Sequence, residues 1–226
     1  MSIQPGQCHV IACATVIEEM LPLMPKGVSY QTFELGLHAY PDRLRVELQK
    51  AIDAAAAAAD PDTETILLGY GLCSRAVAGL KSARHTLVVP RIDDCIGIFL
   101  GSAAEYDRQH RNEPGSLYLT KGWIEAGAPF DGHDELIRRW GREKADMIQA
   151  RMLKNYTRLV FIRTGDGDLE QYQKRSQTAA ARLNLRFEEI QGSGELVRRM
   201  VFGPWDMDFV VTPPGREISF LDFRKS

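Results

Sequence analysis

The chain has 226 residues, with 28 Lys and Arg residues against 30 Asp and Glu residues, so its formal net charge is −2 at pH 7. Hydrophobic residues make up 44% of the sequence and charged residues 26%, which is the composition of an ordinary globular protein. This composition excludes a disordered tail, a collagen-like fibre and a disulfide scaffold. The balanced charge predicts no nucleic-acid partner, because wrapping a phosphate backbone needs clustered positive charge.

No apolar run approaches the roughly 18 residues of a membrane span. Residues 1–6 lack the basic segment before an apolar core that marks a signal peptide. We therefore expect a cytoplasmic protein that does not bind membranes. In that compartment cysteines are reduced thiols, available for metal binding or catalysis. The sequence has four: Cys8, Cys13, Cys73 and Cys95.

Short runs rich in Val, Ile, Leu, Phe and Tyr alternate with helical patterns along most of the chain. The runs predict strands at residues 8–12, 29–35, 65–70, 86–89, 116–120, 158–162, 186–190 and 209–212. Helices are predicted at residues 41–59, 94–110, 133–155, 169–183 and 193–202. This alternation is typical of βαβ units. We expect an α/β fold with a mainly parallel sheet and helices on both faces, a Rossmann-like or flavodoxin-like three-layer sandwich. It would form a single domain, 1–226, with two lobes if the chain breaks near the Gly and Pro residues of 127–132.

A thiol or an imidazole follows each of the first four predicted strands. Cys13 follows the first strand, His38 the second, Cys73 the third and Cys95 the fourth. In open α/β sheets ligands bind beyond the carboxyl ends of the strands, so a parallel sheet would bring these side chains to one edge. Cys8, five residues before Cys13 on the opposite face of the strand, is predicted to be a buried small hydrophobic residue instead.

Three thiols and an imidazole that converge from separate strands predict a metal centre. Zinc and iron–sulfur clusters both take thiolates and imidazoles from several directions. The wide spacing of Cys13, Cys73 and Cys95 excludes a zinc ribbon or finger, which needs a Cys-x-x-Cys pair. A three-cysteine 4Fe-4S cluster, whose fourth iron binds His38, water or substrate, is slightly favoured over zinc, and both remain open.

Further polar residues and glycines accompany this set. Gly69 and Gly71 are predicted to bind the cofactor, or to let the backbone turn so that Cys73 sits at a helix N-terminus, where the dipole lowers the pKa of the thiol. Arg91 and Asp94 flank Cys95 and could bind a substrate carboxylate or move protons. The structural alternative is that Asp94 caps a helix and Arg91 pairs with a neighbouring acid. Trp123 could close over a bound cofactor as an aromatic lid.

With these residues identified, the chain resembles the DUF1638 family, bacterial and archaeal proteins of unassigned function. The resemblance is carried by Ile-Ala-Cys at 11–13, Gly-Leu-His at 36–38 before Pro41, Gly-Tyr-Gly-Leu-Cys at 69–73, Pro-Arg at 90–91 with Asp-Cys at 94–95, Leu-Gly-Ser at 100–102, and Pro-Gly at 114–115 leading to Gly-Trp-Ile-Glu at 122–125. The resemblance implies a genomic neighbourhood of corrinoid-dependent methyltransferase systems.

Three hypotheses follow. The first is a metal-dependent enzyme, a transferase or lyase, or an enzyme accessory, that acts on a small molecule in sulfur or methyl-group chemistry. Cys13, Cys73, Cys95 and His38 would hold the metal, while His38, Asp94 and Arg91 would serve catalysis. The second is a non-catalytic partner of a corrinoid protein or methyltransferase that handles a small molecule. The third is metal-free catalysis with Cys73 as nucleophile and His38 as base.

Overall fold

The computed structural model describes residues 7–58, 63–127, 132–165 and 167–224. The chain forms two compact units. The first comprises Met1–Tyr106 and Ser193–Ser226, and the second comprises Asp107–Gly192. The second unit is thus an insertion within the sequence of the first.

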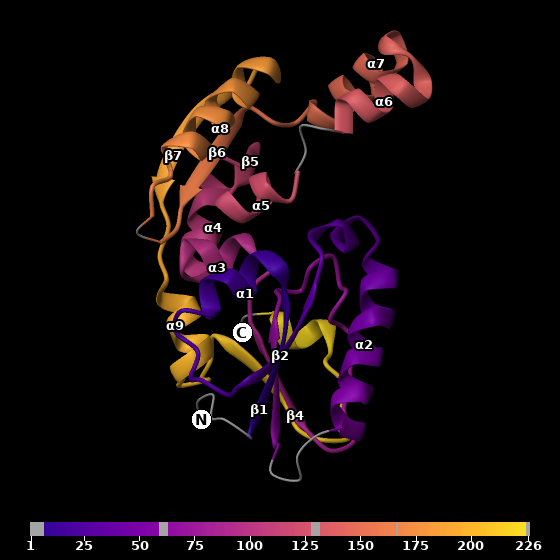
Figure 1. The fold of residues 1–226 in the computed structure, drawn as a ribbon, viewed down its shortest axis with the longest axis vertical. Coiled ribbons are helices and arrows are strands. Elements are labelled where there is room, and N and C mark those ends of the chain that lie inside the picture. Colours follow the sequence, from indigo (N-terminus) through magenta and orange to yellow (C-terminus); the bar gives the residue numbers. More distant parts are fainter. Residues whose placement is uncertain (1–6, 59–62, 128–131, 166, 225–226) are drawn as a thin grey trace. The chain divides into compact units, whose positions relative to one another are not determined.

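The first unit is built on a five-stranded sheet in the order β2-β1-β3-β4-β8 (Figure 1). Strands β1 (Cys8–Cys13), β2 (Ser29–Phe33), β3 (Thr65–Gly69) and β4 (Thr86–Pro90) run parallel to one another, and β8 (Phe209–Thr212) runs antiparallel to β4. β1 and β3 are almost completely buried, as expected for central strands covered on both faces.

Helices cover both faces of this sheet, as the predicted three-layer arrangement requires. Figure 1 shows α2 (Pro41–Ala58) along one face and α1 (Ala14–Met20) and α9 (Glu195–Phe202) along the other, where α9 packs against α1 and α3 (Ile96–Leu100). The buried residues Leu44, Leu48 and Ile52 give α2 the apolar stripe that the sequence predicted. The 3-10 helices η1 (Leu35–Ala39) and η2 (Phe220–Phe223) complete the first unit, and α4 (Ala103–Asn112) continues into the second.

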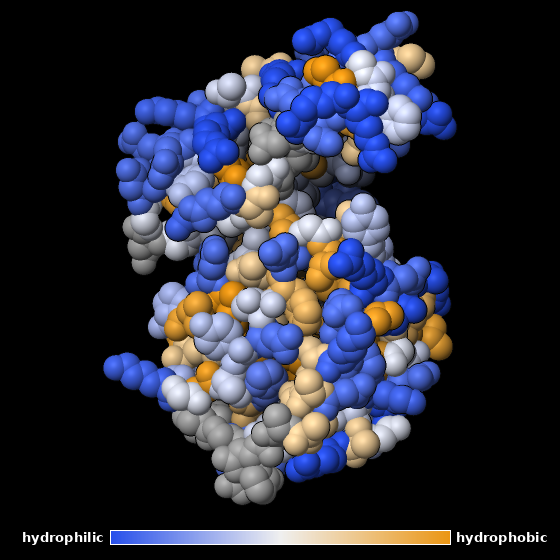
Figure 2. Space-filling view, turned by 45° about the vertical axis from the view of Figure 1, so that its right-hand side comes forward, coloured by the Kyte–Doolittle hydropathy of each residue, from blue (hydrophilic) through white to orange (hydrophobic). Residues whose placement is uncertain are grey.

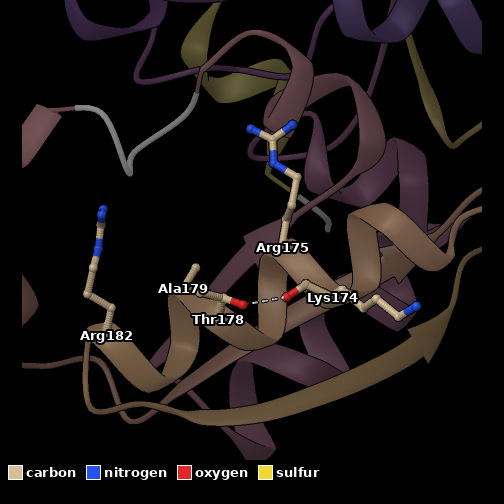
Figure 3. Close-up of a pocket in the computed structure, with 5 residues that line it drawn as sticks. All are labelled: Lys174, Arg175, Thr178, Ala179 and Arg182. Atoms are coloured by element: carbon tan, nitrogen blue, oxygen red, sulfur yellow. Dashed lines mark hydrogen bonds between the residues drawn. The ribbon is translucent and has the colours of Figure 1, made fainter.

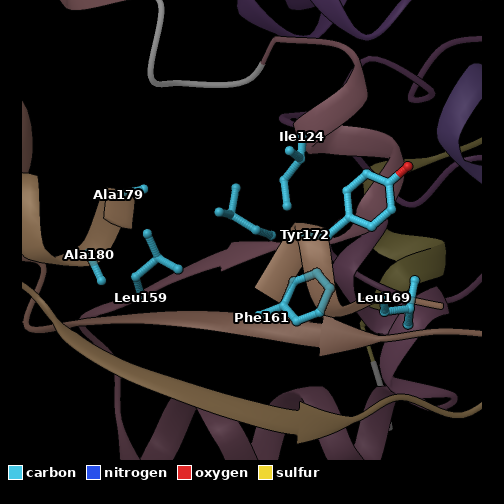
Figure 4. Packing of buried hydrophobic residues seen from close by; sticks show 8 residues of the cluster. Ile124, Leu159, Phe161, Leu169, Tyr172, Ala179 and Ala180 are labelled. Carbon is cyan, nitrogen blue, oxygen red and sulfur yellow. The ribbon is translucent and has the colours of Figure 1, made fainter. Parts of the chain in front are cut away.

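The second unit contains a parallel sheet in the order β5-β6-β7, formed by β5 (Ser116–Leu119), β6 (Arg158–Arg163) and β7 (Arg186–Gln191). Its helices in the described ranges are α5 (Lys121–Glu125), α6 (Gly132–Trp140), α7 (Arg142–Leu153) and α8 (Glu170–Arg182). Figure 4 shows its core, in which Phe161 of β6 and Tyr172 of α8 lie among smaller apolar side chains.

The predicted α/β class and all eight predicted strands are confirmed, with strand ends that differ by at most two residues. The strands form two sheets, and β8 is antiparallel. The predicted helix at 94–110 is wrong as a single element: α3 ends at Gly101, whose φ of +87° cannot continue a right-handed helix. The predicted helix at 133–155 is likewise divided at Gly141, with φ +79°. The break predicted near 127–132 lies mostly outside the described residues and stays a prediction. None of the helices in the described part of the chain is both long and apolar enough to cross a membrane.

Candidate thiol centre

Four neighbouring parallel strands of the first unit each lead to one of the predicted ligand residues. Cys13 is the last residue of β1, and His38 lies in η1 after β2. Cys73 follows β3, and Cys95 immediately precedes α3 after β4. Because the strands are adjacent and parallel, their carboxyl ends share one edge of the sheet, which is the edge that the sequence analysis predicted for the site.

The loops after β3 and β4 are held together through their backbones. The amide of Leu72 donates to the carbonyl of Ile92 over 2.8 Å, and the amide of Cys73 donates to the carbonyl of Asp93 over 2.8 Å. A Cβ atom on Gly71 would lie 2.9 Å from the backbone of Asp94. Glycine at position 71 therefore permits the approach that brings the loop of Cys73 against the loop of Cys95.

Cys73 is not at the start of a helix, so the predicted activation by a helix dipole is wrong. Cys73, Ser74 and Arg75 have φ angles of +46°, +55° and +70°, three successive non-glycine residues in the left-handed region. Such a turn costs roughly 1–2 kcal/mol per residue and persists only where the surroundings impose it. Here Arg45 donates to the carbonyl of Arg75 over 3.3 Å, and the Arg75 guanidinium stacks 4.5 Å above the ring centre of Phe220.

The three thiols of the site are buried, and burial keeps them protonated at neutral pH. Burial raises the pKa of Cys73 to about 12, with smaller contributions from Asp94 and Cys13. Burial also raises the pKa of Cys95 well above its usual range, and the nearby thiols of Cys73 and Cys13 raise it further. Burial raises the pKa of Cys13, partly opposed by hydrogen bonds from Thr15 and Val16.

Cys8 differs from these three cysteines, as predicted. It lies on β1, and its side chain is only 3% exposed. Burial raises the pKa of its thiol to about 12, opposed by a hydrogen bond with the backbone of Leu67, and none of the other cysteines contributes to this shift. Cys8 is therefore a buried residue of the core, as the sequence indicated.

His38 supplies an imidazole without a hydrogen-bond partner on one nitrogen. Its side chain is half-buried, and its Nε2 atom is buried with no hydrogen-bond partner. Burial lowers the pKa of His38, so the ring is neutral at pH 7 and its basic nitrogen can ligate a metal. The ring centre lies 6.2 Å from that of Tyr70, with 34° between the ring planes.

Tyr70 is the residue of this region that the sequence analysis missed. Its side chain is 1% exposed, and its Oη atom has no hydrogen-bond partner. Burial raises the pKa of the phenol, and Cys13, Cys73 and Cys95 each raise it further. The only sequence signal for Tyr70 as a site residue is its place in the Gly-Tyr-Gly-Leu-Cys segment. A tyrosine at that position is equally consistent with the last residue of a buried strand.

Asp94 and Arg91 both have structural partners. The Asp94 carboxylate accepts a hydrogen bond from the amide of Ile96 over 2.9 Å and another from the Tyr106 hydroxyl over 2.9 Å. It thereby stabilises the start of α3, but the N-cap position belongs to Cys95, so the predicted N-cap at Asp94 is wrong by one residue. Arg91 donates to the carbonyl of Phe209 over 3.1 Å, while its Nε atom is buried without a partner.

The residues predicted to bind a cofactor have packing roles in the structure. A Cβ atom on Gly69 would lie 2.5 Å from the Cβ of Ala12, its partner on β1, so this glycine lets the two strands pack closely. Trp123 belongs to the second unit, where it packs against the apolar core. A cofactor role for Gly69, Gly71 or Trp123 stays a prediction.

As the side chains stand, no group of three or more His, Cys, Asp or Glu residues in the described ranges is arranged to hold a metal ion. The thiols are in the protonated form that burial imposes. Their side chains are not set in coordination geometry.

Two pockets of the second unit are lined by residues that do not belong to the candidate thiol centre. One, of about 300 Å³, lies along α8, where Figure 3 shows Arg175 and Arg182 extending from the same side of the helix. The other, of about 510 Å³, lies between α6, α7 and β5 and is lined mainly by apolar residues such as Leu136, Met152 and Tyr156. The face of the molecule in Figure 2 is mostly hydrophilic with hydrophobic residues scattered over it, which is normal for a protein surface.

Comparison with known families identifies the class to which this α/β protein belongs. A family model described as "Protein of unknown function (DUF1638)" matches residues 32–201. The match covers most of the chain, so the chain belongs to the DUF1638 family. It includes His38, Cys73 and Cys95, whereas Cys13 precedes it. No curated protein and no solved structure gives a significant match.

Proposed function

We propose that this protein holds a metal centre with Cys13, Cys73 and Cys95 and acts on a small molecule as a metal-dependent enzyme or enzyme accessory. The observation that carries the proposal is that three buried cysteines come at or just after the carboxyl ends of three adjacent parallel strands. His38 lies in η1, which follows β2, the neighbour of β1 on its other side. In this proposal His38 is a fourth ligand or lies beside an open coordination position.

The residues present fit a metal that prefers sulfur. Three thiolates with an imidazole are a donor set for zinc, and three thiolates with an open position suit a 4Fe-4S cluster. Nε2 of His38 is buried and has no hydrogen-bond partner, so a metal would give this nitrogen a bond that it lacks. The thiols would lose their protons on binding, and their side chains would rotate into coordination geometry.

A bound zinc would activate a thiol for methyl or alkyl transfer, and a cluster with an open corner would act as a Lewis acid or carry sulfur. The chain's own residues would position the substrate. Arg91 carries a positive charge and a buried Nε without a partner, so it can bind an anionic group. His38, neutral at pH 7, can accept a proton when it is not ligating.

The second candidate function is a non-catalytic protein that handles a small molecule for a corrinoid protein or a methyltransferase. The observation that favours it is the protonated, tightly packed state of the thiols, in which they behave as small core residues. Its distinguishing property is stable folding and partner binding without metal.

Metal-free catalysis by Cys73 is disfavoured. A thiol with a pKa of about 12 is ionised in roughly one molecule in 10⁵ at pH 7, whereas nucleophilic cysteines have lowered pKa values. A buried cysteine in this state is inert unless a cation stabilises its thiolate.

The test is the metal and acid-labile sulfide content of protein purified without oxygen, together with its visible spectrum. Iron with sulfide and a brown colour identifies a cluster, and stoichiometric zinc without colour identifies a zinc site. Cys13→Ala, Cys73→Ala and Cys95→Ala are each expected to abolish binding.

The matched control is Cys8→Ala. Cys8 is on the same strand as Cys13 and equally buried, but the thiols of the site do not influence its pKa, so this variant is expected to keep its metal. Protein that remains metal-free after anaerobic reconstitution with iron and sulfide, or with zinc, would overturn the proposal and leave the binding protein as the favoured function.

A further inference from the structure

The larger pocket of the second unit has the size and shape of a small-molecule site. Its volume of about 510 Å³ is within the range that bound ligands occupy in proteins. Its walls come from β5, α6, α7 with the residues that follow it, and the end of α8. The apolar residues that line it are Leu117, Leu136, Met152, Leu153, Tyr156 and Leu183. We call it the apolar pocket.

Two large apolar side chains of the apolar pocket remain in contact with water. Met152 is 68% exposed and Tyr156 is 38% exposed. Exposed apolar side chains that gather at a concave surface are typical of binding sites, because a ligand that covers them removes apolar surface from water. A methionine suits this position, since its flexible thioether adjusts to the shape of what it contacts. An apolar molecule in the pocket would therefore be stabilised by burial of these side chains.

Two polar side chains, His133 and Gln149, lie among the apolar walls. Nε2 of His133 lies 2.8 Å from a carboxylate oxygen of Asp146, and because a carboxylate only accepts, Nε2 carries the proton of this hydrogen bond. In the neutral ring Nδ1 is then an acceptor. The Gln149 amide offers both a donor and an acceptor, and within the described ranges its side chain makes no hydrogen bond. Asp146 and Gln149 are three residues apart on α7, so the polar groups are on the same side of that helix.

The lining of the apolar pocket favours a ligand without charge. Among the described residues that line it there is no Asp, Glu, Lys or Arg. A charge buried against apolar walls without a partner is unfavourable. The Asp146 carboxylate is already paired with His133 and would repel an anion. The pocket along α8 differs in this respect, because Lys174, Arg175 and Arg182 line it.

We propose that the apolar pocket binds an uncharged, mainly apolar small molecule whose polar group forms a hydrogen bond with Gln149 or His133. The proposal does not rest on the metal centre, whose residues belong to the first unit. A second copy of the chain is the other occupant to consider. Walls from several elements with polar groups among them fit a small molecule better than the surface of a second copy.

The experiment uses the full-length protein and N-phenyl-1-naphthylamine, an uncharged probe in which an N–H group joins two aromatic groups. Its fluorescence rises in apolar surroundings, and saturable binding at one site per chain is expected. The charged counterpart is 8-anilinonaphthalene-1-sulfonate, which has the same aromatic groups and a sulfonate. It is expected to bind at least about 10-fold more weakly, because the pocket supplies no counter-charge.

Met152→Trp and Met147→Trp are the matched variants. Both methionines are on α7 and 68% exposed, so both positions have room for a larger side chain, but only Met152 lines the apolar pocket. Met152→Trp narrows the pocket and is expected to weaken binding of the uncharged probe at least about 10-fold. Met147→Trp is expected to keep wild-type affinity. Melting temperatures measured by circular dichroism show whether both variants are folded.

Leu136→Trp is a second blocking variant, because Leu136 lines the apolar pocket from α6. It is expected to weaken the uncharged probe in the same way as Met152→Trp. If neither variant folds, the comparison of the two probes on the wild-type protein still tests the proposal.

Three results would overturn the proposal. The first is a wild-type protein that shows no saturable binding of the uncharged probe, or that binds both probes equally well. The second is wild-type affinity in both Met152→Trp and Leu136→Trp, which would place the probe elsewhere. The third comes from sedimentation velocity: a wild-type dimer that excludes the probe and that Met152→Trp dissociates would show that a second copy covers the pocket.

Discussion

The amide of Cys73 donates a 2.8 Å hydrogen bond to the carbonyl of Asp93, two residues before Cys95. This bond joins the loop after β3 to the loop after β4, so the positions of Cys73 and Cys95 are fixed by backbone contacts rather than by side-chain packing alone. The two loops that carry these cysteines are thereby held against each other. Substitutions that separate the two backbones are expected to affect both cysteines together.

Gly71→Ala is expected to push these loops apart. Its new Cβ would lie 2.9 Å from the backbone of Asp94, and backbone atoms cannot yield as the end of a flexible side chain can. Overpacking of this kind typically costs about 1–3 kcal/mol of unfolding free energy. Urea denaturation followed by circular dichroism measures the change.

The control for Gly71→Ala is Gly36→Ala. Gly36 lies in η1, and a Cβ atom there would meet nothing within 4 Å. We expect a change within about 0.5 kcal/mol, as for other substitutions away from packed regions. Equal destabilisation by the two alanines would show that close approach of the loops is not the reason for glycine at position 71.

Asp94 and Tyr106 are expected to show coupled effects on stability. The Tyr106 hydroxyl donates to the carboxylate that also accepts from the amide of Ile96 at the start of α3. Asp94→Ala removes a capping interaction worth about 0.5–2 kcal/mol, and Tyr106→Phe removes one hydrogen bond to a charged group. A double-mutant cycle measured by chemical denaturation should give a coupling energy of about 0.5–3 kcal/mol. Additive effects would contradict the contact between Asp94 and Tyr106.

The positions of the proposed ligands could be predicted because the strand signals were strong. β1, β3 and β4 are mainly apolar, and a cysteine either ends the strand, as Cys13 ends β1, or follows it within five residues, as Cys73 and Cys95 do. Parallel order then places those cysteines at one edge without further information. The family resemblance, too, depended on segments at these strand ends, and the family match confirmed it.

The local backbone of the site could not be predicted from the sequence. Cys73, Ser74 and Arg75 adopt left-handed angles although none is a glycine, because contacts from Arg45 and Phe220, far away in the sequence, hold the turn. Nor did the sequence show that Gly101 and Gly141 end helices, since a single glycine is also tolerated inside one. Tyr70 was missed because its distinguishing feature is a buried hydroxyl without a hydrogen-bond partner, which a sequence does not display.

In the second unit, Arg158→Ala is expected to be strongly destabilising. The Arg158 side chain is 2% exposed and is held by Glu188 over 2.7 Å, by Ser116 over 2.7 Å and by Gln109 over 2.8 Å. Breaking such a buried ion pair from one side typically costs about 3–5 kcal/mol. Thermal and urea denaturation measure the loss.

Arg186→Ala is the matched control for Arg158→Ala. Arg186 also pairs with Glu188, at 3.2 Å, but its side chain is 56% exposed. Exposed ion pairs contribute about 0–1 kcal/mol, so the control should change stability little. Losses of similar size from both variants would contradict the structural role assigned to the burial of Arg158.

Stability at alkaline pH is expected to depend on Cys8, whose folded pKa of about 12 is raised by burial from an unfolded value near 9. Between these values the unfolded chain has lost the thiol proton and the folded chain keeps it, so unfolding is favoured as pH rises. The contribution of the protonated Cys8 thiol to the free energy of unfolding is therefore fully present below about pH 9. Above pH 9 this contribution falls by about 1.4 kcal/mol per pH unit, up to the folded pKa. Cys8→Ala lacks this group, so its deficit in unfolding free energy relative to wild type should shrink between pH 9 and pH 11, measured by urea denaturation under reducing conditions. A deficit that stays constant across this range would show that Cys8 ionises equally in both states.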